Sequence, residues 1–508
     1  MVLAIVHVML RRLNRCTITA MDGEQLLSNF ARSFLGLNEP APAIRADGSV
    51  GLIPRVYLDS AATCLMPHAV WMTMEAYLHA ACANSHTSAS AQGRTTTQAL
   101  HDAHDAVGRL VGYNPETDCV VFAGSGATGP MNMLADMLMV DSARPIALVS
   151  TQEHHSNFLP WIRSAGAKNV RFIPTTVSGE IDLDVLAKLL RENAGRVRVV
   201  AVTALSNVTG VINPVNRIAE MTHAAGAQIV VDGAQAAAHI PLVMHPELHV
   251  GISSKTGWLD YLALSGHKLY APGSPGVLIG RKDTFCNCGW NQRAPVGGGT
   301  VDLVDFLNVT FKIDPTERFE AGTPDIPGAI GLGAAAMILQ QINLWTIRQH
   351  EHALVAYALD QLKSVHEIIV YGPTNPGVRA ALVSFNIGDM AHGLVAAALN
   401  DYAAIAVRND CFCAQSYVRS LIFQACEELG YCAPMTVERR GMVRASFGVY
   451  TTYEDIDRLV TALQWISLNR EQLRRDYIHD GNGGFQHRWF RPQATFSLKD
   501  TVAAQVGG

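Results

Sequence analysis

Residues 228–235 read QIVVDGAQ, and residues 261–268 read YLALSGHK. In both, an apolar run typical of a buried strand leads into polar residues that include Asp232 and Lys268. A buried carboxylate without a partner is costly, so Asp232 is expected to face a cation or a hydrogen-bond donor. A partly desolvated lysine at the end of a sheet has a lowered pKa and can form a Schiff base. Taken alone, Asp232 also fits a helix N-cap and Lys268 a solvated surface lysine.

Outward from these two segments, short apolar runs alternate with longer amphipathic stretches. Strands are predicted at residues 119–123, 146–150, 170–173, 199–204, 228–231, 261–264 and 276–279, and helices at 97–111, 182–193 and 215–225. Alternating helices and fully apolar strands are typical of a mostly parallel sheet covered on both faces. We therefore predict an α/β fold whose large domain holds a mostly parallel, seven-stranded sheet.

The pattern changes after Gly-Thr-Pro at residues 322–324. A long helical region rich in Ala, Leu and Gln follows, and then strands near residues 380–385 and 443–446 and a closing helix near 453–466. This order predicts a smaller α+β domain. The predicted division is an N-terminal extension (1–50), a large cofactor-binding domain (51–325), a small C-terminal domain (326–475) and a polar, Gly-rich, peripheral tail (476–508).

Composition narrows the possible classes of protein. Of 508 residues, 49% are hydrophobic and 16% charged, and the formal net charge is −5. This composition argues against a disordered chain, and the lack of a basic block argues against a nucleic-acid surface. The ten cysteines have no framework spacing, which indicates reduced thiols and a cytoplasmic protein. The apolar run at residues 1–10 is too short to span a membrane and precedes its arginines, the reverse of a signal peptide; an organellar presequence and a later start at Met21 stay open.

Two further polar segments follow predicted strands. Residues 124–129 read GSGATG, a small-residue turn suited to a phosphate at a helix N-terminus, although such turns are often only turns. Residues 153–157 read EHHSN, where the histidines would alternatively be part of a hydrogen-bonded loop. A lysine, an acid, a phosphate cradle and a flat partner for a ring together are what pyridoxal 5'-phosphate requires. On this interpretation Asp232 faces the ring nitrogen and His154 stacks on the ring.

Several segments also resemble a known family. They are YLDSAA (57–62), EHH (153–155), SNVTG (206–210), VDGAQ (231–235), SGHK (265–268), RFEAGTP (318–324) and RAS (444–446). In this order they resemble the class V aminotransferase family of fold type I, and within it the cysteine desulfurase and selenocysteine lyase branch, over residues 56–468. The resemblance implies a pyridoxal-phosphate enzyme that forms a homodimer with active sites at the subunit interface.

The resemblance assigns roles to individual residues. For the cofactor it implies Lys268 as the Schiff-base lysine, Asp232 at the ring nitrogen, Gln235 at the ring hydroxyl and His154 on the ring face, with further contacts from Asn207, Ser265, His267, Ala127, Thr128 and, reaching the partner subunit's phosphate, Thr300. For the substrate it implies Arg444 at the α-carboxylate, since a guanidinium pairs bidentately with a carboxylate, with Asn207, His86 and Arg408 as further contacts. The GSGATG turn departs from the family's Gly-Thr-Thr-Glu-Gly form, so its individual contacts are less defined.

Residues 407–415, VRNDCFCAQ, align with the family's loop that carries the sulfur-accepting cysteine, and Cys413 takes its place. Its thiolate would attack the sulfur of bound cysteine and leave a persulfide and alanine. Alternatively, Cys411 and Cys413 are buried hydrophobes. The family's Gly-His-His is Asp410-Cys411-Phe412 here, so Cys411 would either resolve a persulfide or signal another substrate. Cys286 and Cys288 would form a metal or redox cluster with these thiols or, more simply, be unrelated loop thiols; no metal is predicted.

The predicted function is therefore removal of sulfur or selenium from L-cysteine-type substrates through a Cys413 persulfide. Within the same fold, a C–S lyase, an epimerase or an aminotransferase is the alternative. A different class, a cofactor-binding or sulfur-carrier scaffold without turnover, is disfavoured because it would not need Lys268, Asp232, His154 and Arg444 together. The predicted partners are an amino-acid substrate, a second copy of the chain and a sulfur-acceptor protein, with no nucleic acid and no membrane.

Overall fold

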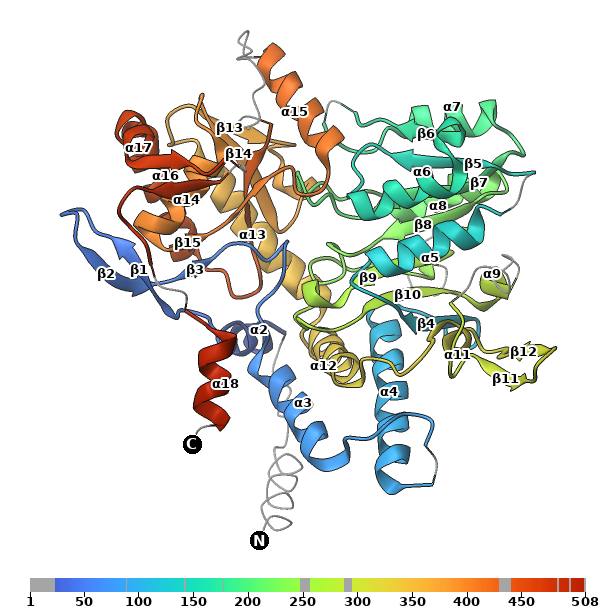
Figure 1. Ribbon diagram of the computed structural model, residues 1–508. Helices are drawn as coiled ribbons and strands as arrows, with labels where there is room; N and C mark the ends of the chain where they lie inside the picture. Colours follow the sequence, from blue (N-terminus) through green and yellow to red (C-terminus); the bar gives the residue numbers. More distant parts are fainter. Residues whose placement is uncertain are drawn as a thin grey trace.

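Seven strands form the central sheet of the computed structural model (Figure 1), which describes residues 23–506 except 88, 141–142, 177, 247–255, 287–294, 429–439, 482–483 and 493–494. Their order across the sheet is β4 (Asp118–Phe122), β10 (Gly276–Arg281), β9 (Tyr261–Ser265), β8 (Gln228–Asp232), β7 (Val197–Thr203), β5 (Ile146–Ser150) and β6 (Val170–Ile173). Only β10 runs antiparallel to its two neighbours. The predicted α/β fold with a mostly parallel seven-stranded sheet is confirmed.

Helices cover both faces of this sheet because successive side chains of a strand point to opposite sides. In β8, Ile229 and Val231 join one core and Val230 joins the other. The first core is closed by α4 (Ala91–Leu110), α7 (Leu183–Glu192), α8 (Val215–Ala224) and α12 (Ile326–Ile342), and the second by α5 (Thr128–Leu138) and α6 (Leu159–Ala165). Both faces are therefore buried, as a parallel sheet requires.

The carboxyl ends of three neighbouring strands bring polar residues to one edge of the sheet. Thr203 at the end of β7 pairs in register with Asp232 at the end of β8, and Asp232 pairs with Ala263 of β9. Ser265 ends β9, and a single 3₁₀ turn, Gly266–Lys268, follows it. In open α/β sheets this edge is where ligands bind.

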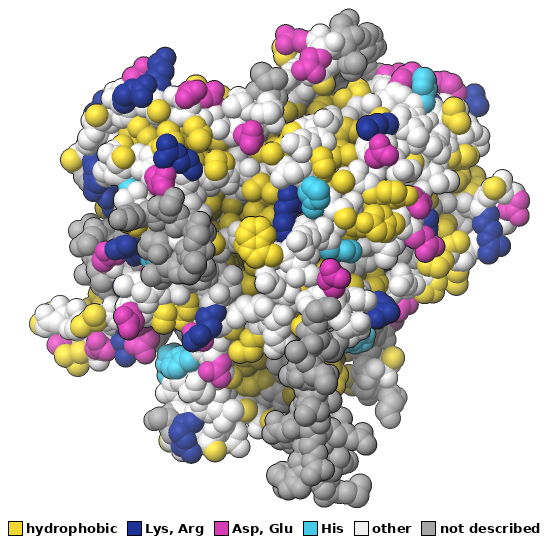
Figure 2. All heavy atoms as spheres, turned by 180° about the vertical axis from the view of Figure 1, so that it is seen from behind, with side chains coloured by type: hydrophobic (Ala, Val, Ile, Leu, Met, Phe, Trp, Pro, Cys, Tyr) yellow, Lys and Arg dark blue, Asp and Glu magenta, His cyan; other side chains and the backbone are white. Residues whose placement is uncertain are grey.

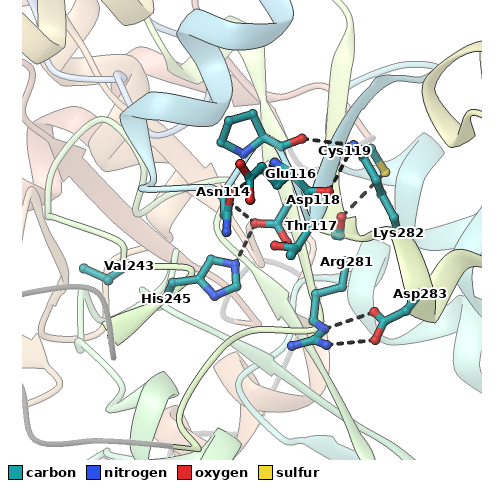
Figure 3. Close-up of polar contacts among 12 residues, drawn as sticks. Asn114, Glu116, Thr117, Asp118, Cys119, Val243, His245, Arg281, Lys282 and Asp283 are labelled. Atoms are coloured by element: carbon teal, nitrogen blue, oxygen red, sulfur yellow. Dashed lines mark hydrogen bonds and ion pairs between the residues drawn. The ribbon is translucent and has the colours of Figure 1, made fainter.

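The opposite end of the sheet holds structural ion pairs. Figure 3 shows Asp118, the first residue of β4, between His245 and the backbone N–H of Asn114. The His245 Nε2 to Asp118 Oδ2 distance is 2.7 Å, and both side chains are buried. At the start of β9, His223 and Asp260 form a similar pair at 2.8 Å. These contacts satisfy carboxylates at the end of the sheet that lies away from the ligand edge.

A second sheet forms the smaller C-terminal unit (Figure 1). Its antiparallel strands are β13 (Ile368–Tyr371), β14 (Leu382–Ile387), β17 (Met442–Ser446) and β16 (Arg408–Asp410), packed with α13 (Leu344–Leu362), α14 (His392–Ala403) and α16 (Tyr453–Leu468). Strands β13 and β16 were not expected from the sequence: β16 is short and polar, and β13 is apolar but only four residues long. Strand β16 ends directly before Cys411, and α15 (Gln415–Glu428) follows the loop.

Both ends of the chain add to this framework. Helix α2 (Gly23–Ala31) places Leu27 and Phe30 in the first core. Next come the hairpin of β1 (Pro40–Ile44) and β2 (Val50–Pro54) and the short parallel pair β3 (Val56–Tyr57) and β15 (Ile405–Ala406). After α17 (Arg470–Asp476), the hairpin of β18 (Tyr477–His479) and β19 (Phe485–His487) buries Tyr477, His487 and Phe490. The expectation of a peripheral tail is therefore wrong for this hairpin, while α18 (Leu498–Val506) buries no residue.

Among the described residues, the remaining α-helices are α3 (His68–Ala81), α9 (Lys282–Cys286) and α11 (Pro315–Phe319), and a hairpin of β11 (Val301–Val304) and β12 (Val309–Phe311) projects from the large domain (Figure 1). On the face seen in Figure 2, Lys and Arg side chains are scattered among Asp and Glu. Within the described ranges no single helix is long and apolar enough to span a membrane. Helices α12 and α13 taken together pass by length and composition, but they are bent by 79°.

Candidate active site

A cavity of about 830 Å³ lies at the ligand edge of the large sheet and extends to the small domain. It brings together most of the residues predicted from the sequence, which come from β8, β9, β16, β17, the start of α5 and the loops and turns that follow the strands. Those lining it are Ala127, Thr128, His154, Asn207, Asp232, Gln235, Ser265, His267, Lys268, Arg408, Cys413 and Arg444. Two predicted residues, His86 and Thr300, do not line it.

Lys268 lines this cavity and is only partly exposed, so it is not a solvated surface lysine. Burial lowers the pKa of its ammonium group, and the nearby Asp232 carboxylate acts in the opposite direction. Burial likewise raises the pKa of Asp232, against the hydrogen bond from the Ala234 backbone N–H to Oδ1 (2.9 Å) and the charge of Lys268. A lowered pKa increases the share of the neutral amine, which is the form that can react with an aldehyde.

The turn between β4 and α5 forms a small cradle beside Ser265. Gly124 and Gly126 have φ values of +58° and +51°, which side chains disfavour. The Ala127 N–H donates to Ser265 Oγ at 2.8 Å, and Thr128 Oγ1 lies 2.6 Å from Ser156 Oγ. Helix α5 begins at Thr128, so its N-terminus points its free N–H groups at this turn. Burial lowers the pKa of His267, which also lines the cradle, to about 4, so this imidazole is neutral at pH 7.

His154 is a neutral imidazole whose tautomer is fixed by its neighbour. The Ser156 backbone N–H donates to Nδ1 at 3.1 Å, which leaves the ring proton on Nε2. Burial, and then the positive charges of Lys268 and other nearby groups, lower the pKa of His154 to about 3. A flat, uncharged ring held at the cavity wall is suited to stacking on a planar ligand.

Glu153 supports this wall from behind, a role that the sequence did not reveal although it lies in the EHH motif. It accepts hydrogen bonds from Asn157 Nδ2 at Oε2 (2.6 Å) and from the Thr203 backbone N–H at Oε1 (2.8 Å), and also contacts Ser150. The Trp161 indole N–H donates to Asn157 Oδ1 at 2.9 Å, which fixes the orientation of that amide. Burial, more than any nearby charge, raises the pKa of Glu153 to about 8.

A second buried set that the sequence did not reveal lies behind Gln235. Gln235 Nε2 is 3.4 Å from His239 Nε2, and His239 Nδ1 is 2.7 Å from Glu351 Oε1. His239 and Glu351 are 1% and 0% exposed. Glu351 comes from α13, so this series of contacts joins the large domain to the helix that leads into the small domain.

Cys413 lies in a loop with an unusual backbone. Asp410, Phe412 and Cys413 have φ values of +95°, +52° and +56°, a conformation that is unfavourable for residues other than glycine. The His155 N–H donates to the Cys413 carbonyl at 2.6 Å, which helps to hold the loop. Cys413 is exposed to the cavity and is therefore not a buried hydrophobe.

The neighbouring Cys411 differs from Cys413 in its exposure. It is buried, and its thiol donates to Asp410 Oδ1 at 3.1 Å. Burial and then this hydrogen bond raise the pKa of Cys411 to about 12, so its thiol stays protonated at neutral pH. The interpretation of Cys411 as a resolving thiol has no support in this geometry, and the interpretation as a buried hydrophobe fits it.

Arg444, on β17, is 3% exposed and reaches the cavity from the small domain. Its Nη1 donates to the Asn207 carbonyl at 2.9 Å, and its Nη2 lies 3.5 Å from Asp59 Oδ1. Burial lowers the pKa of Arg444 to about 10, so it remains charged at neutral pH. Among the described residues its Nε has no hydrogen-bond partner. A charged guanidinium with free N–H groups is suited to binding a carboxylate.

Some predicted residues lie outside this constellation. Thr300 is buried and donates to the Gly297 carbonyl at 2.8 Å, and His86 is exposed, with its backbone N–H bound to Thr97 Oγ1 at 3.0 Å. The predicted role of Thr300 needs a second copy of the chain, and the predicted substrate contact of His86 has no support in this cavity, which His86 does not line. The Cys286 side chain and Cys288 lie outside the described residues. Elsewhere in the described ranges no group of three or more His, Cys, Asp or Glu side chains is arranged to hold a metal ion.

Comparison with known proteins gives a consistent result. The sequence profile described as Aminotransferase class-V matches residues 56–459. A probable cysteine desulfurase of Halalkalibacterium halodurans is 35% identical over 425 residues, which are 82% of this chain and 94% of the relative. A cysteine desulfurase of Dickeya dadantii is 34% identical over 440 residues, covering 84% and 97%. Among solved structures, a cysteine desulfurase from Thermococcus onnurineus has a TM-score of 0.70 at 31% identity, and the match covers 82% of this chain and 95% of that one. The cysteine desulfurase CsdA of Escherichia coli has a TM-score of 0.68 at 28% identity, and the match covers 87% of this chain and 98% of that one.

Proposed function

The chain belongs to the class V aminotransferase family, and on that premise we propose that it is a cysteine desulfurase that removes sulfur or selenium from L-cysteine-type amino acids and leaves alanine. Family membership and relatives named cysteine desulfurase at 31–35% identity indicate a pyridoxal-phosphate-dependent enzyme. The observation that carries the finer proposal is that Cys413, an exposed thiol, lines the same cavity as Lys268, Asp232 and Arg444.

The residues present fit pyridoxal phosphate. Lys268 offers an amine of lowered pKa in the cavity, and Asp232 offers a buried carboxylate that a ring N–H⁺ would satisfy. The cradle has no room for larger residues, since a Cβ at Gly276 would overlap the Gly126 carbonyl and one at Gly126 would lie 3.0 Å from Ser265 Oγ. The phosphate would be held by Ser265, His267 and Thr128. The ring would be held by His154 and Gln235. When bound, the cofactor supplies the electron sink that weakens bonds at the α- and β-carbons of an amino acid.

The protein's own residues then have distinct tasks. Arg444 binds the α-carboxylate and so orients the amino acid with its sulfur toward Cys413. The Cys413 thiolate attacks that sulfur, so that a new S–S bond forms as the bond between sulfur and the β-carbon breaks. The electron pair of the broken bond stays with the carbon skeleton. The Lys268 ammonium group donates a proton to it, which yields alanine and leaves a persulfide on Cys413.

We further propose a homodimer and a sulfur-acceptor protein. The hairpin β11–β12 carries Leu303, Phe306 and Leu307, which are 65%, 107% and 92% exposed, and Thr300 lies at its base. A second copy covering this apolar hairpin would bring Thr300 to the neighbouring cavity, as its predicted role requires. Because the persulfide would form on an exposed thiol, an acceptor protein could reach it. The cytoplasmic location of the protein remains a prediction.

The decisive experiment measures sulfide and alanine released from L-cysteine with a thiol reductant present. Wild type and Cys411→Ala are expected to release both products at similar rates, because the Cys411 thiol is buried and protonated. Cys413→Ala is expected to lose at least about a hundredfold, since the nucleophile itself is gone. Unchanged turnover by Cys413→Ala would reject the persulfide route and favour a C–S lyase. Pyruvate and ammonia released together with sulfide would favour a C–S lyase, whereas 3-mercaptopyruvate formed without sulfide when a keto-acid acceptor is added would favour an aminotransferase.

A further inference from the structure

Three contacts link Phe412, Asn207 and Arg444 into a closed triangle. Asn207 Nδ2 donates to the Phe412 carbonyl at 2.8 Å, and the Arg444 guanidinium donates to the Asn207 carbonyl at 2.9 Å. The triangle closes where the Arg444 guanidinium carbon lies 4.7 Å from the centroid of the Phe412 ring. All three residues are buried, which strengthens such a cation–π contact because water does not compete.

The triangle holds a backbone that is unfavourable on its own. Phe412 and Cys413 both have left-handed φ values, and a turn bond from the Ala414 N–H to the Cys411 carbonyl (2.9 Å) spans them. Two consecutive non-glycine residues in this region are strained, and strained segments persist only where their surroundings hold them. The contacts of Phe412 with Asn207 and Arg444, together with the His155 bond to Cys413, supply that support.

We propose that Phe412 is a positioning residue that fixes the Cys413 thiol relative to Arg444, so that the nucleophile and the carboxylate-binding site move as one unit. The inference rests on the proposed function for its biological meaning, but its geometry stands on these contacts. At this position the related family has a histidine, which could exchange protons, whereas a phenyl ring cannot. The ring acts through Arg444 and the loop and touches no reacting atom.

The coupling also limits how Arg444 can bind a ligand. The Asn207 carbonyl occupies one N–H, Asp59 lies near another, and the Phe412 ring covers one face. The guanidinium cannot turn without breaking one of these contacts. A carboxylate is therefore bound in one orientation, and the Cys413 loop is anchored to the same group.

The test measures how fast iodoacetamide modifies Cys413 in the purified holoenzyme, by mass spectrometry. Cys82, which is exposed and does not line the cavity, is the internal reference. Phe412→Leu removes the ring face and keeps an apolar side chain, Phe412→Tyr keeps the ring face, and Arg444→Lys keeps the charge and loses the planar group. Thermal unfolding checks each variant, and Phe412→Met replaces Phe412→Leu if the latter does not fold.

We expect Phe412→Leu and Arg444→Lys each to raise the modification rate of Cys413 relative to Cys82 by about two- to fivefold, the range of a cation–π contact. The double variant should exceed neither single variant, because both break the same triangle. Phe412→Tyr should remain near wild type. In turnover, Phe412→Leu should lower kcat and raise KM for L-cysteine together.

Unchanged modification rates in both single variants, or additive effects in the double variant, would overturn the proposal. The modification assay needs no turnover, so it separates this inference from the proposed function. If Cys413→Ala still released sulfide while the coupling was present, only the persulfide function would fail. If Cys413 proved essential while the coupling was absent, only the role of Phe412 would fail.

Discussion

His239 Nδ1 lies 2.7 Å from Glu351 Oε1, and this pair joins the loop after β8 to the helix that leads into the small domain. Replacing Glu351 by Ala leaves a buried imidazole N–H without an acceptor, which costs about 2–4 kcal/mol of unfolding free energy. Glu351→Gln keeps an acceptor oxygen and should lose less than half as much. Urea-induced unfolding at pH 7 measures both values. Equal losses for Ala and Gln would show that the contact to His239 does not stabilise the fold.

Glu153→Gln is expected to be harmful although it changes few atoms. Each carboxyl oxygen of Glu153 accepts an N–H from a group that cannot turn round, namely the Thr203 backbone and the Asn157 amide held by Trp161. A glutamine NH₂ would therefore face another N–H in either orientation, at a cost of about 1–3 kcal/mol. Urea unfolding of the variant measures this loss.

The matched control for Glu153→Gln is the double variant Glu153→Gln with Asn157→Asp. The introduced aspartate would still accept from the Trp161 indole, and its second oxygen would accept from the new glutamine amide. The double variant should therefore regain most of the lost stability. If the single variant is as stable as wild type, or the double variant regains nothing, the hydrogen-bond arrangement around Glu153 is not what determines stability there.

The pair of His223 and Asp260 should make stability depend on pH. Burial alone would lower the pKa of His223, but the hydrogen bond and charge of Asp260 raise it above its ordinary value of 6.5. A group whose pKa is higher in the folded state stabilises fully below the unfolded value, and this contribution disappears as the pH rises through the folded value. The stability difference between wild type and His223→Gln should therefore shrink as the pH rises above about 6.5. Unfolding free energies across pH 5.5–8.5 measure this difference; a constant difference contradicts the assignment.

Much of the fold could be predicted because the strands of the large sheet are buried on both faces and so read as uninterrupted apolar runs. Residues 229–231 are an example, with side chains alternating between two cores. Strand β16 could not be predicted, since Arg408–Asp410 is polar and pairs only because β17 lies beside it. Likewise, Phe490 is buried although it lies in a polar, Gly-rich stretch, which no local pattern reveals.

The residues of the candidate site also divide into those that a local sequence pattern reveals and those that depend on long-range packing. Lys268 and Asp232 could be predicted because each follows a recognisable strand, and the sheet brings strand ends together. The contacts of Phe412 with Arg444 and of Glu153 with Thr203 join residues 32 and 50 positions apart. Such pairs depend on how the domains and strands pack, and neither residue type nor spacing encodes them. Thr300 shows a further limit, because its predicted role depends on a second chain.

Gly126→Ala should weaken cofactor binding because the new Cβ crowds the side chains of the cradle, and not only because it strains the backbone. Gly126 has φ +51°, and a Cβ there would lie 3.0 Å from Ser265 Oγ and 3.4 Å from His267 Nε2. Gly48→Ala is the matched control, since Gly48 has φ +80° and a Cβ there would meet no atom within 4 Å, so it bears comparable backbone strain without crowding. Both variants should lose about 1–2 kcal/mol of stability.

Only Gly126→Ala should also lower the affinity for pyridoxal phosphate, by roughly tenfold, because displaced Ser265 and His267 side chains would contact the phosphate poorly. Titrating cofactor-free protein with pyridoxal phosphate, followed by absorbance, measures this affinity. Equal affinities for the two variants would mean that the turn at residues 124–129 does not cradle the phosphate. Lys268 and Asp232 would then have to bind the ring with the phosphate directed elsewhere in the cavity, away from the N-terminus of α5.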